Sequence, residues 1–200
     1  VHYPRIELRP MVSAERPWES TLGSYCTLFE DEGRFRLYYE ASSLGEEYGN
    51  YKAFVADAES SDGVNWVKPT IGTVNFQGST DNNLVYGGEL SKGRGAHGAT
   101  VFKDPSAPPE ERYKLVHAAR TEDNRRFVHG AVSPDGLHFK TLEKPVLAGY
   151  GSDTHNVIRF DPDKGRYVGY FRGKAHGNRN MRTIAYADFR GNVQYLSTGN

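Results

Sequence analysis

One short motif occurs twice in this chain: residues 60–66 read SSDGVNW and residues 133–139 read SPDGLHF. Both follow the pattern Ser-x-Asp-Gly-x-x-aromatic, and their aspartates, Asp62 and Asp135, are 73 residues apart (135 − 62). Asp-Gly between two strand-like runs predicts a hairpin turn, because glycine tolerates the positive φ that a tight turn requires. The repetition therefore favours a fold in which the same group of strands recurs.

A second hairpin precedes each of these turns, which makes the predicted repeating unit four antiparallel strands. The aromatic residues Phe29, Phe102 and Phe160 mark the register of the units, with spacings of 73 (102 − 29) and 58 (160 − 102) residues. The predicted leading hairpins are YCTLFED with RFRLYYEAS, GATVFKD with RYKLVHAAR, and HNVIRFD with RYVGYFRG. Four-stranded repeats at such intervals are typical of propeller blades with loop insertions.

The sequence thus predicts an all-β propeller of four-stranded antiparallel blades, with about three of an expected five blades in residues 1–200. We place the blades at about residues 20–70, 95–145 and 153–198, and interpret residues 75–90 as a connection between the first two. A β-sandwich would also contain many short strands, but it would not explain the repeated order of turns. Three blades do not close a ring, so we expect the chain to be the N-terminal part of a longer protein.

Composition narrows the possible partners. Lys plus Arg and Asp plus Glu each number 25, which argues against nucleic acid and anionic membranes as partners. No apolar run is long enough to span a bilayer, and no phosphate-loop, zinc-protease or serine-hydrolase motif is present. We predict no cofactor. The single cysteine, Cys26, says little about the compartment, and a secreted or periplasmic location is weakly preferred.

Polar residues precede each predicted first strand. In a propeller the first strand of every blade lines the central channel, so segments that lead into these strands converge at one mouth of it. Those segments are RPWESTLGSY, GRGAHGAT and YGSDTHNV. They contribute the candidate residues Trp18, Glu19, Arg94, His97, Asp153, His155 and Asn156.

Two carboxylates in this set could support glycoside hydrolysis, which needs one protonated and one ionised acid. We predict Asp153 as the general acid, with its pKa raised by a partly dry pocket, and Glu19 as the base or nucleophile. The alternative for Asp153 is a turn or strand cap, because Gly-Ser-Asp-Thr is turn chemistry. Glu19 could equally be structural.

The remaining candidates are predicted to bind substrate. His97, His155 and Asn156 could contact sugar hydroxyls; the histidines could also be structural, and two without a matched third are a weak metal signal, so we predict no metal. Trp18 could stack on a sugar ring or cover the end of the channel. Arg172 and Arg182 offer forked donors to hydroxyls or a carboxylate, although arginines on strands are often solvated or ion-paired.

Several phrases resemble the five-bladed propeller glycosidases of glycoside hydrolase families 32, 43 and 68, and most of all their unassigned bacterial relatives. They are DGVNWVKP, APPEERYK, SPDGLHF and SDTHNVIRFDPDKG. The resemblance implies three carboxylates, one at the opening of each of the first three blades. The third falls on Asp153, whereas the second falls near His97-Gly98 and the first near Gly23, where no carboxylate is present. Glu19 is the nearest substitute.

The predicted function is therefore a carbohydrate-active propeller, a glycoside hydrolase acting on poly- or oligosaccharides. One alternative is a propeller that binds carbohydrate without cleaving it. Sialidases carry a longer version of the Ser-x-Asp-Gly motif but need three arginines and a tyrosine nucleophile, which Arg172 and Arg182 do not supply. A protein-interaction propeller would instead show patches on the blade tops and no deep pocket. The sequence makes no prediction of the oligomeric state.

Overall fold

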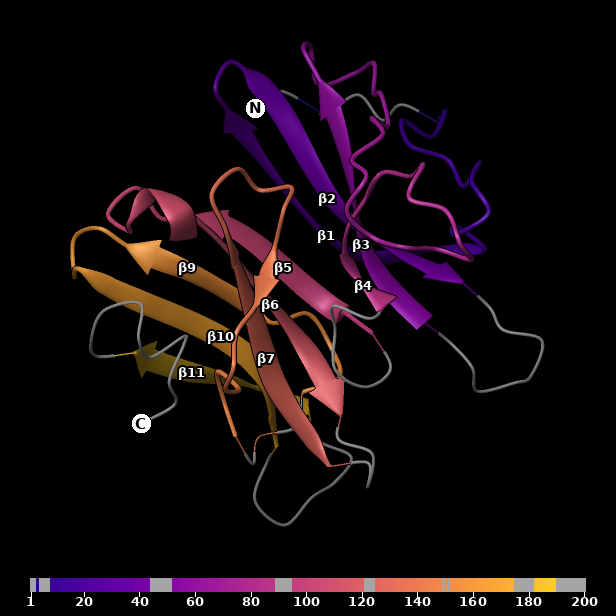
Figure 1. Cartoon of the computed structure of the whole chain (residues 1–200). Coiled ribbons are helices and arrows are strands. Elements are labelled where there is room, and N and C mark those ends of the chain that lie inside the picture. The colour runs from indigo at the N-terminus through magenta and orange to yellow at the C-terminus, as the bar shows by residue number, and fades with distance from the viewer. Residues whose placement is uncertain are drawn as a thin grey trace.

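The computed structural model describes residues 3, 8–43, 52–88, 95–120, 125–148, 150, 152–174 and 182–189, with the backbone alone at 173–174, 182–183 and 188–189. These residues form three antiparallel sheets and no α-helix (Figure 1). The first sheet contains β1 (Thr21–Asp31), β2 (Arg34–Ser43), β3 (Lys52–Ser60) and β4 (Leu84–Gly87). The second contains β5 (His97–Lys103), β6 (Tyr113–Arg120), β7 (Arg126–Ser133) and β8 (Lys140–Thr141), and the third contains β9 (Val157–Asp161), β10 (Arg166–Lys174) and β11 (Arg182–Phe189).

The strands follow one another in sequence order across each sheet, so each sheet is a meander, and we call the three sheets the first, second and third blades. The first strand of each blade lies against the first strand of the next, β1 against β5 and β5 against β9. Figure 1 shows the three blades side by side around these inner strands. This arrangement confirms the predicted all-β fold as part of a propeller.

The two Ser-x-Asp-Gly motifs form matching turns at the ends of β3 and β7. In each, the serine hydroxyl accepts the backbone N–H of the glycine, and the aspartate carboxylate accepts the backbone N–H groups two and three residues further on. Gly63 and Gly136 have φ values of 73° and 76°, which favour glycine. The repeated sequence therefore does report a repeated structure.

The strands that follow these turns differ from the prediction. In the second blade the chain returns directly as β8. In the first blade residues after the turn make only one bridge to β3, between Glu59 and Val67, and the fourth strand is β4 at Leu84–Gly87. The interpretation of residues 75–90 as a connection between blades was therefore wrong: the apolar run at 84–87 is buried and pairs with β3. The fourth strand expected for the third blade lies outside the described residues.

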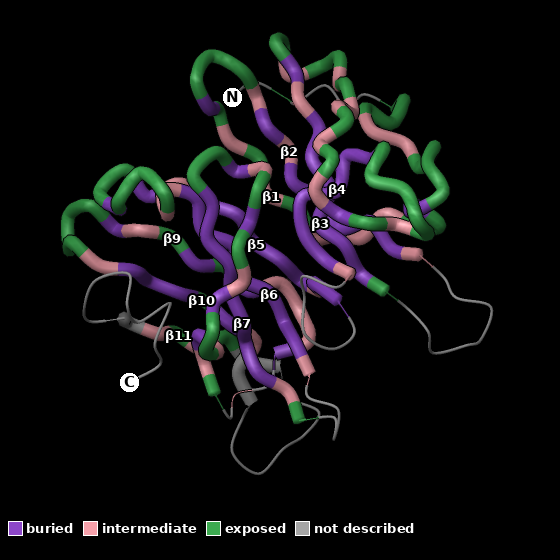
Figure 2. The backbone as a smooth tube through the Cα atoms, viewed as in Figure 1, coloured by how far each residue is buried: buried purple, intermediate pink, exposed green. Residues whose placement is uncertain are grey.

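Apolar side chains pack between the blades, where one core joins the first blade to the second and another joins the second to the third. Tyr38, Val55, Val101 and Leu115 belong to the first core. Figure 2 shows the buried residues concentrated along the strands and the exposed ones in the turns. Alternate strand residues point to opposite faces, so β2 contributes Tyr38 to this core and Tyr39 to a third cluster on the other face of the first blade.

Candidate active site at the blade axis

The segments leading into β5 and β9 meet closely at one end of the inner strands. Gly98 has a φ of 61°, and a Cβ there would lie 2.2 Å from the backbone oxygen of Thr154. The backbone N–H of Asn156 donates to the Gly98 carbonyl at 3.0 Å. Only glycine permits this approach of two backbones. The expected convergence of these two segments is therefore present.

His97 joins all three blades at this point. Its Nδ1 lies 3.0 Å from Oε1 of Glu40 on β2, and its Nε2 lies 3.1 Å from the backbone oxygen of Asp153. The hydrogen bond with Glu40 raises the pKa of His97 against the opposing effect of burial. Both neighbours of the ring are acceptors, which matches the imidazolium form because it donates from both nitrogens.

The Asp153 carboxylate is held by two arginines. Arg126 at the start of β7 donates to Oδ2 at 2.5 Å, and Arg172 on β10 donates to Oδ1. Burial acts to raise the pKa of Asp153, but the hydrogen bonds and charges of these two arginines outweigh it and hold the pKa below its ordinary value. About 31% of the side chain remains exposed. Asp153 is thus an ionised carboxylate that solvent can reach.

Tyr25 and His155 complete the group around His97. The Tyr25 ring centroid lies 5.3 Å from that of His97 and 5.5 Å from that of His155. Nε2 of His155 is 2.9 Å from the Thr100 hydroxyl, and burial lowers the pKa of His155. We call Tyr25, Glu40, His97, Asp153 and His155 the axial cluster.

A pocket of about 270 Å³ opens beside the axial cluster. His97 and Asp153 contribute to its wall, together with Arg120 at the end of β6. Small residues supply most of the rest: Gly95, Ala118, Ala119 and Ser152. The wall of the pocket therefore combines three polar or charged side chains with small, mostly apolar residues.

Glu19 and Trp18 do not belong to this cluster. The Tyr39 hydroxyl donates to Glu19 Oε1 at 2.6 Å, and Lys68 Nζ lies 2.7 Å from Oε2. Because Tyr39 and Glu40 point to opposite faces of β2, the first blade separates Glu19 from His97. The Glu19 side chain is fully buried, and the Trp18 indole N–H donates to Asn83 inside the same cluster of the first blade. Both residues fix the N-terminal segment to the first blade, which corrects the placement predicted for them.

The other predicted residues have varied surroundings. The Asn156 amide is buried and donates to the backbone oxygens of Gly98 and Thr154, so it supports the convergence of segments. Arg172 contacts Asp153 rather than lying on a solvated face. Arg182 begins β11, but its side chain lies outside the described residues, as does Arg94.

Sequence reasoning missed Tyr25, Glu40, Arg120 and Arg126. Glu40 is 2% exposed and accepts the backbone N–H of Gly98 in addition to facing His97. A glutamate inside the otherwise apolar run LYYEA was a usable signal, because a buried acid needs a partner. Arg126 gave no such signal, since an arginine at the start of a strand is ordinary.

Among the residues that the structure describes, no three His, Cys, Asp or Glu side chains are grouped to hold a metal ion. The described chain also has no helix with the length and apolar character needed to cross a membrane.

No protein-family model and no curated protein sequence matches this chain. Solved structures do match its fold. A thermostable family-43 glycoside hydrolase is 16% identical with a TM-score of 0.54, over 88% of this chain and 51% of its own. The Bombyx mori family-32 β-fructofuranosidase BmSUC1 is 12% identical with a TM-score of 0.56, over 86% of this chain and 35% of its own.

A structure from the GH130 family of mannoside phosphorylases, which contains glycoside hydrolases, is 11% identical with a TM-score of 0.55. It is matched over 88% of this chain and 50% of its own length. The chain thus spans about half the length of these proteins or less. At such identities the likeness is one of fold, and it confirms the resemblance to the propeller glycosidases at that level.

Proposed function

We propose that this chain forms part of a glycoside hydrolase that acts on poly- or oligosaccharides at the axial cluster. The observation that carries the proposal is an ionised, partly exposed carboxylate, Asp153, in the wall of a pocket beside His97, the residue that contacts both the first blade and the segment leading into the third. The fold shared with family-32 and family-43 glycosidases supports the same proposal. A carbohydrate is the substrate class, and it would enter through the pocket beside His97.

The role of Asp153 in this proposal differs from the one expected from sequence. A general acid must hold a proton near neutral pH, whereas the two arginines lower the pKa of Asp153. An ionised carboxylate instead suits the nucleophile, the base, or the group that stabilises an oxocarbenium-like transition state. Glu40 is too deeply buried beside His97 to contact substrate directly, so it acts by holding His97.

A second candidate function is carbohydrate binding without cleavage. It is favoured by one observation: both Asp153 oxygens accept arginine hydrogen bonds, and the other acid of the axial cluster, Glu40, is buried. Glycoside hydrolysis by the usual route needs two carboxyl groups that reach the substrate. Binding and cleavage must therefore be measured separately.

The test is a glycan panel in which binding and hydrolysis are scored for the wild-type chain, Asp153→Asn and Asp163→Asn. Asp163 is exposed in the turn between β9 and β10 and is the matched control. We expect Asp153→Asn to lower the hydrolysis rate at least about 100-fold, the scale of a positioned acid or base, and Asp163→Asn to leave it unchanged. Undiminished hydrolysis by Asp153→Asn would remove Asp153 from the reaction. Glycan binding with no hydrolysis by the wild-type chain would select the second candidate.

A further inference from the structure

The two Ser-x-Asp-Gly motifs end on aromatic residues that have different surroundings. In the second blade, Phe139 is 4% exposed and belongs to the core between the first and second blades. In the first blade, Trp66 is only partly buried: it packs against the third cluster and also lines a hollow of about 570 Å³. We call this hollow the turn pocket. The aromatic position that is part of the core in one blade therefore forms the wall of a pocket in the other.

Other apolar side chains of the turn pocket are also exposed. Val64 and Val67 lie on either side of Trp66 in the sequence and are 47% and 66% exposed, and Met11 of the N-terminal segment is 38% exposed. Single exposed apolar residues are ordinary, but a group of them around a hollow indicates a binding site. The volume of about 570 Å³ also lies in the range of sites for small ligands.

A buried ion pair holds two walls of the turn pocket together. Lys68 Nζ lies 2.7 Å from Glu19 Oε2 and donates to the backbone oxygen of Ser13 at 2.6 Å. The same Glu19 oxygen accepts the backbone N–H groups of Glu15 and Arg16. The N-terminal segment is thereby fixed to the residues that follow the turn. A pocket whose walls are already fixed loses less conformational entropy when a ligand binds.

Charged groups of both signs lie in the wall of the turn pocket. Glu15 and Arg16 are exposed, and their side chains make no hydrogen bond or ion pair with the other residues that the structure describes. Arg9 also lines the pocket. A hydroxyl group both donates and accepts, so it can bond to a carboxylate and to a guanidinium. A sugar offers several such hydroxyls, together with an apolar ring face of C–H groups that packs on an aromatic side chain.

We propose that the turn pocket is a second saccharide-binding site, in which a sugar ring packs on the Trp66 indole and its hydroxyls bond to Glu15 and Arg16. The choice of a saccharide rests on the proposed function, which gives the chain an oligosaccharide substrate. The turn pocket shares no wall residue with the pocket of the axial cluster, and Glu19, which holds its walls, lies across the first blade from His97. The site therefore binds saccharide without taking part in cleavage.

Acrylamide quenching of tryptophan fluorescence tests this site directly. The chain has two tryptophans, and Trp18 is only 8% exposed, so the quencher reaches mainly Trp66. The probes are neutral pentasaccharides: cellopentaose, xylopentaose, mannopentaose and arabinopentaose. We expect at least one probe to protect Trp66 from quenching in a saturable way. Asp153→Asn should show the same midpoint as wild type, because Asp153 lies in the other pocket.

Calorimetry with the protecting probe then measures the effect of substitutions. The binding event whose Kd equals the quenching midpoint should weaken about 10-fold or more in Trp66→Ala, the scale of a lost aromatic contact. Trp66→Phe keeps an aromatic face and an apolar group against the third cluster, so it should fall between Trp66→Ala and wild type. Tyr170→Ala is the matched control, because Tyr170 is an aromatic residue that is 49% exposed on the third blade. It should leave the event unchanged.

The outcomes separate the second site from the proposed hydrolase. Absence of protection by every probe would overturn the inference, as would an unchanged Kd in Trp66→Ala. Protection that disappears in Asp153→Asn would also overturn it, because the saccharide would then be bound at the axial cluster. Hydrolysis without protection of Trp66 refutes the second site and leaves the proposed function intact. Protection without hydrolysis supports the second site and counts against the hydrolase.

Discussion

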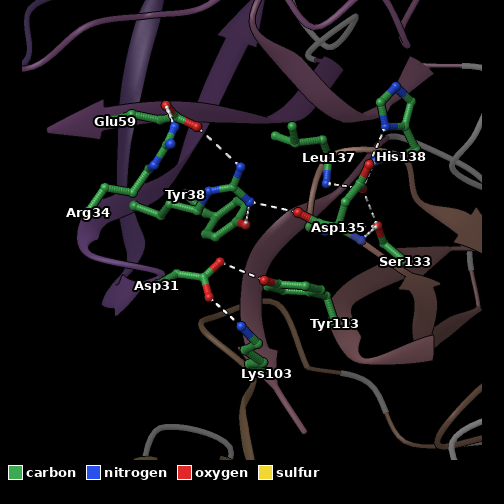
Figure 3. Close-up of polar contacts among 12 residues, drawn as sticks. Asp31, Arg34, Tyr38, Glu59, Lys103, Tyr113, Ser133, Asp135, Leu137 and His138 are labelled. Atoms are coloured by element: carbon green, nitrogen blue, oxygen red, sulfur yellow. Dashed lines mark hydrogen bonds and ion pairs between the residues drawn. The ribbon is translucent and has the colours of Figure 1, made fainter. Parts of the chain in front are cut away.

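The two contacts between blades share a tyrosine–aspartate hydrogen bond, which we call the lock, but the residues around this bond differ. In each lock, an aspartate at or just beyond the end of an inner strand accepts a hydrogen bond from a tyrosine hydroxyl at the start of the second strand of the next blade. Asp31 accepts the hydrogen bond of Tyr113, and Asp104 accepts that of Tyr167. In the first contact Lys103 Nζ also lies 2.5 Å from Asp31 (Figure 3). In the second, Phe160 holds the position that Lys103 holds in the first, directly opposite the tyrosine, and packs on the Tyr167 ring.

A second difference lies on β2 and β6. Arg36 reaches from the first blade to the backbone oxygen of Asp135 in the second, at 2.8 Å. Lys114 holds the same place in the second blade, one residue after Tyr113, but pairs with Glu111 of its own blade. The lock is thus the part that repeats, whereas the added charges depend on single positions. The first contact should therefore be the more polar of the two and the more tolerant of losing its tyrosine.

The outer face of the third blade completes this comparison. Tyr170 and Ile184 stand where Tyr38 and Val55 stand in the first blade, as the strand registers show. Tyr38 and Val55 are each 2% exposed because the second blade covers them, whereas Tyr170 and Ile184 are 49% and 82% exposed. Asp161 ends β9 at the position of Asp31, and its carboxylate pairs with Lys164. This face therefore has the chemistry of a contact between blades.

The largest expected effect comes from replacing Gly136, the turn glycine of the second blade, and we compare it with the same replacement at Gly63 in the first blade. Both have positive φ, so an alanine should cost about 1 kcal/mol at either position. At Gly136 a Cβ would also lie 2.4 Å from the Tyr38 hydroxyl and 2.8 Å from a guanidinium nitrogen of Arg36, whereas at Gly63 the nearest atom is 3.6 Å away. We expect Gly136→Ala to lower the free energy of unfolding by about 4 kcal/mol once overpacking is added, and Gly63→Ala by about 1 kcal/mol. Urea denaturation measures both; equal losses would show that the turn of the second blade does not depend on the first blade.

A smaller effect separates the two locks. Tyr167→Phe leaves Asp104, which is 1% exposed, with Ser106 as its side-chain partner, and we expect a loss of about 2 kcal/mol. Tyr113→Phe leaves Asp31 paired with Lys103, so a loss of about 1 kcal/mol is expected. Thermal unfolding of the two variants gives the order. A larger loss for Tyr113→Phe would contradict the idea that Lys103 reinforces the first lock.

The sequence predicted the features that depend on local residue patterns. It failed for the features that depend on contacts between residues far apart in the chain. The Asp-Gly turns, the strand pairs and the meeting of the segments around His97 and Asp153 follow from repeated turns and alternating strands. Glu19 was misplaced because its distance from β1 in sequence does not say on which face of the first blade it packs, and Tyr39 and Lys68 decide that. The low pKa of Asp153 depends on Arg126 of another blade, and no local sequence pattern predicts that contact.

An effect of the opposite sign, a gain of stability, is expected at a buried acid that only the first contact contains. Asp57 follows Val55 on the same face of β3, and Gly130 holds the matching position in the second blade. Neither Asp57 oxygen accepts a hydrogen bond within the part of the chain that the structure describes. Burial raises the pKa of Asp57 to about 7, against the opposing charge of Arg36.

The direction of the pH effect follows from that raised pKa. Below pH 3.8, the ordinary pKa, the Asp57 carboxyl is protonated in both the folded and the unfolded chain. Between pH 3.8 and about 7 the carboxyl ionises in the unfolded chain but stays protonated in the folded one, so the free energy of unfolding falls as pH rises. Asp57→Asn cannot ionise. We therefore expect it to be more stable than wild type by about 2 kcal/mol above neutral pH, with the advantage shrinking toward acid pH. Urea denaturation across this range tests the sign, and an advantage that grows as pH falls would show that Asp57 is stabilised as a carboxylate by Arg36.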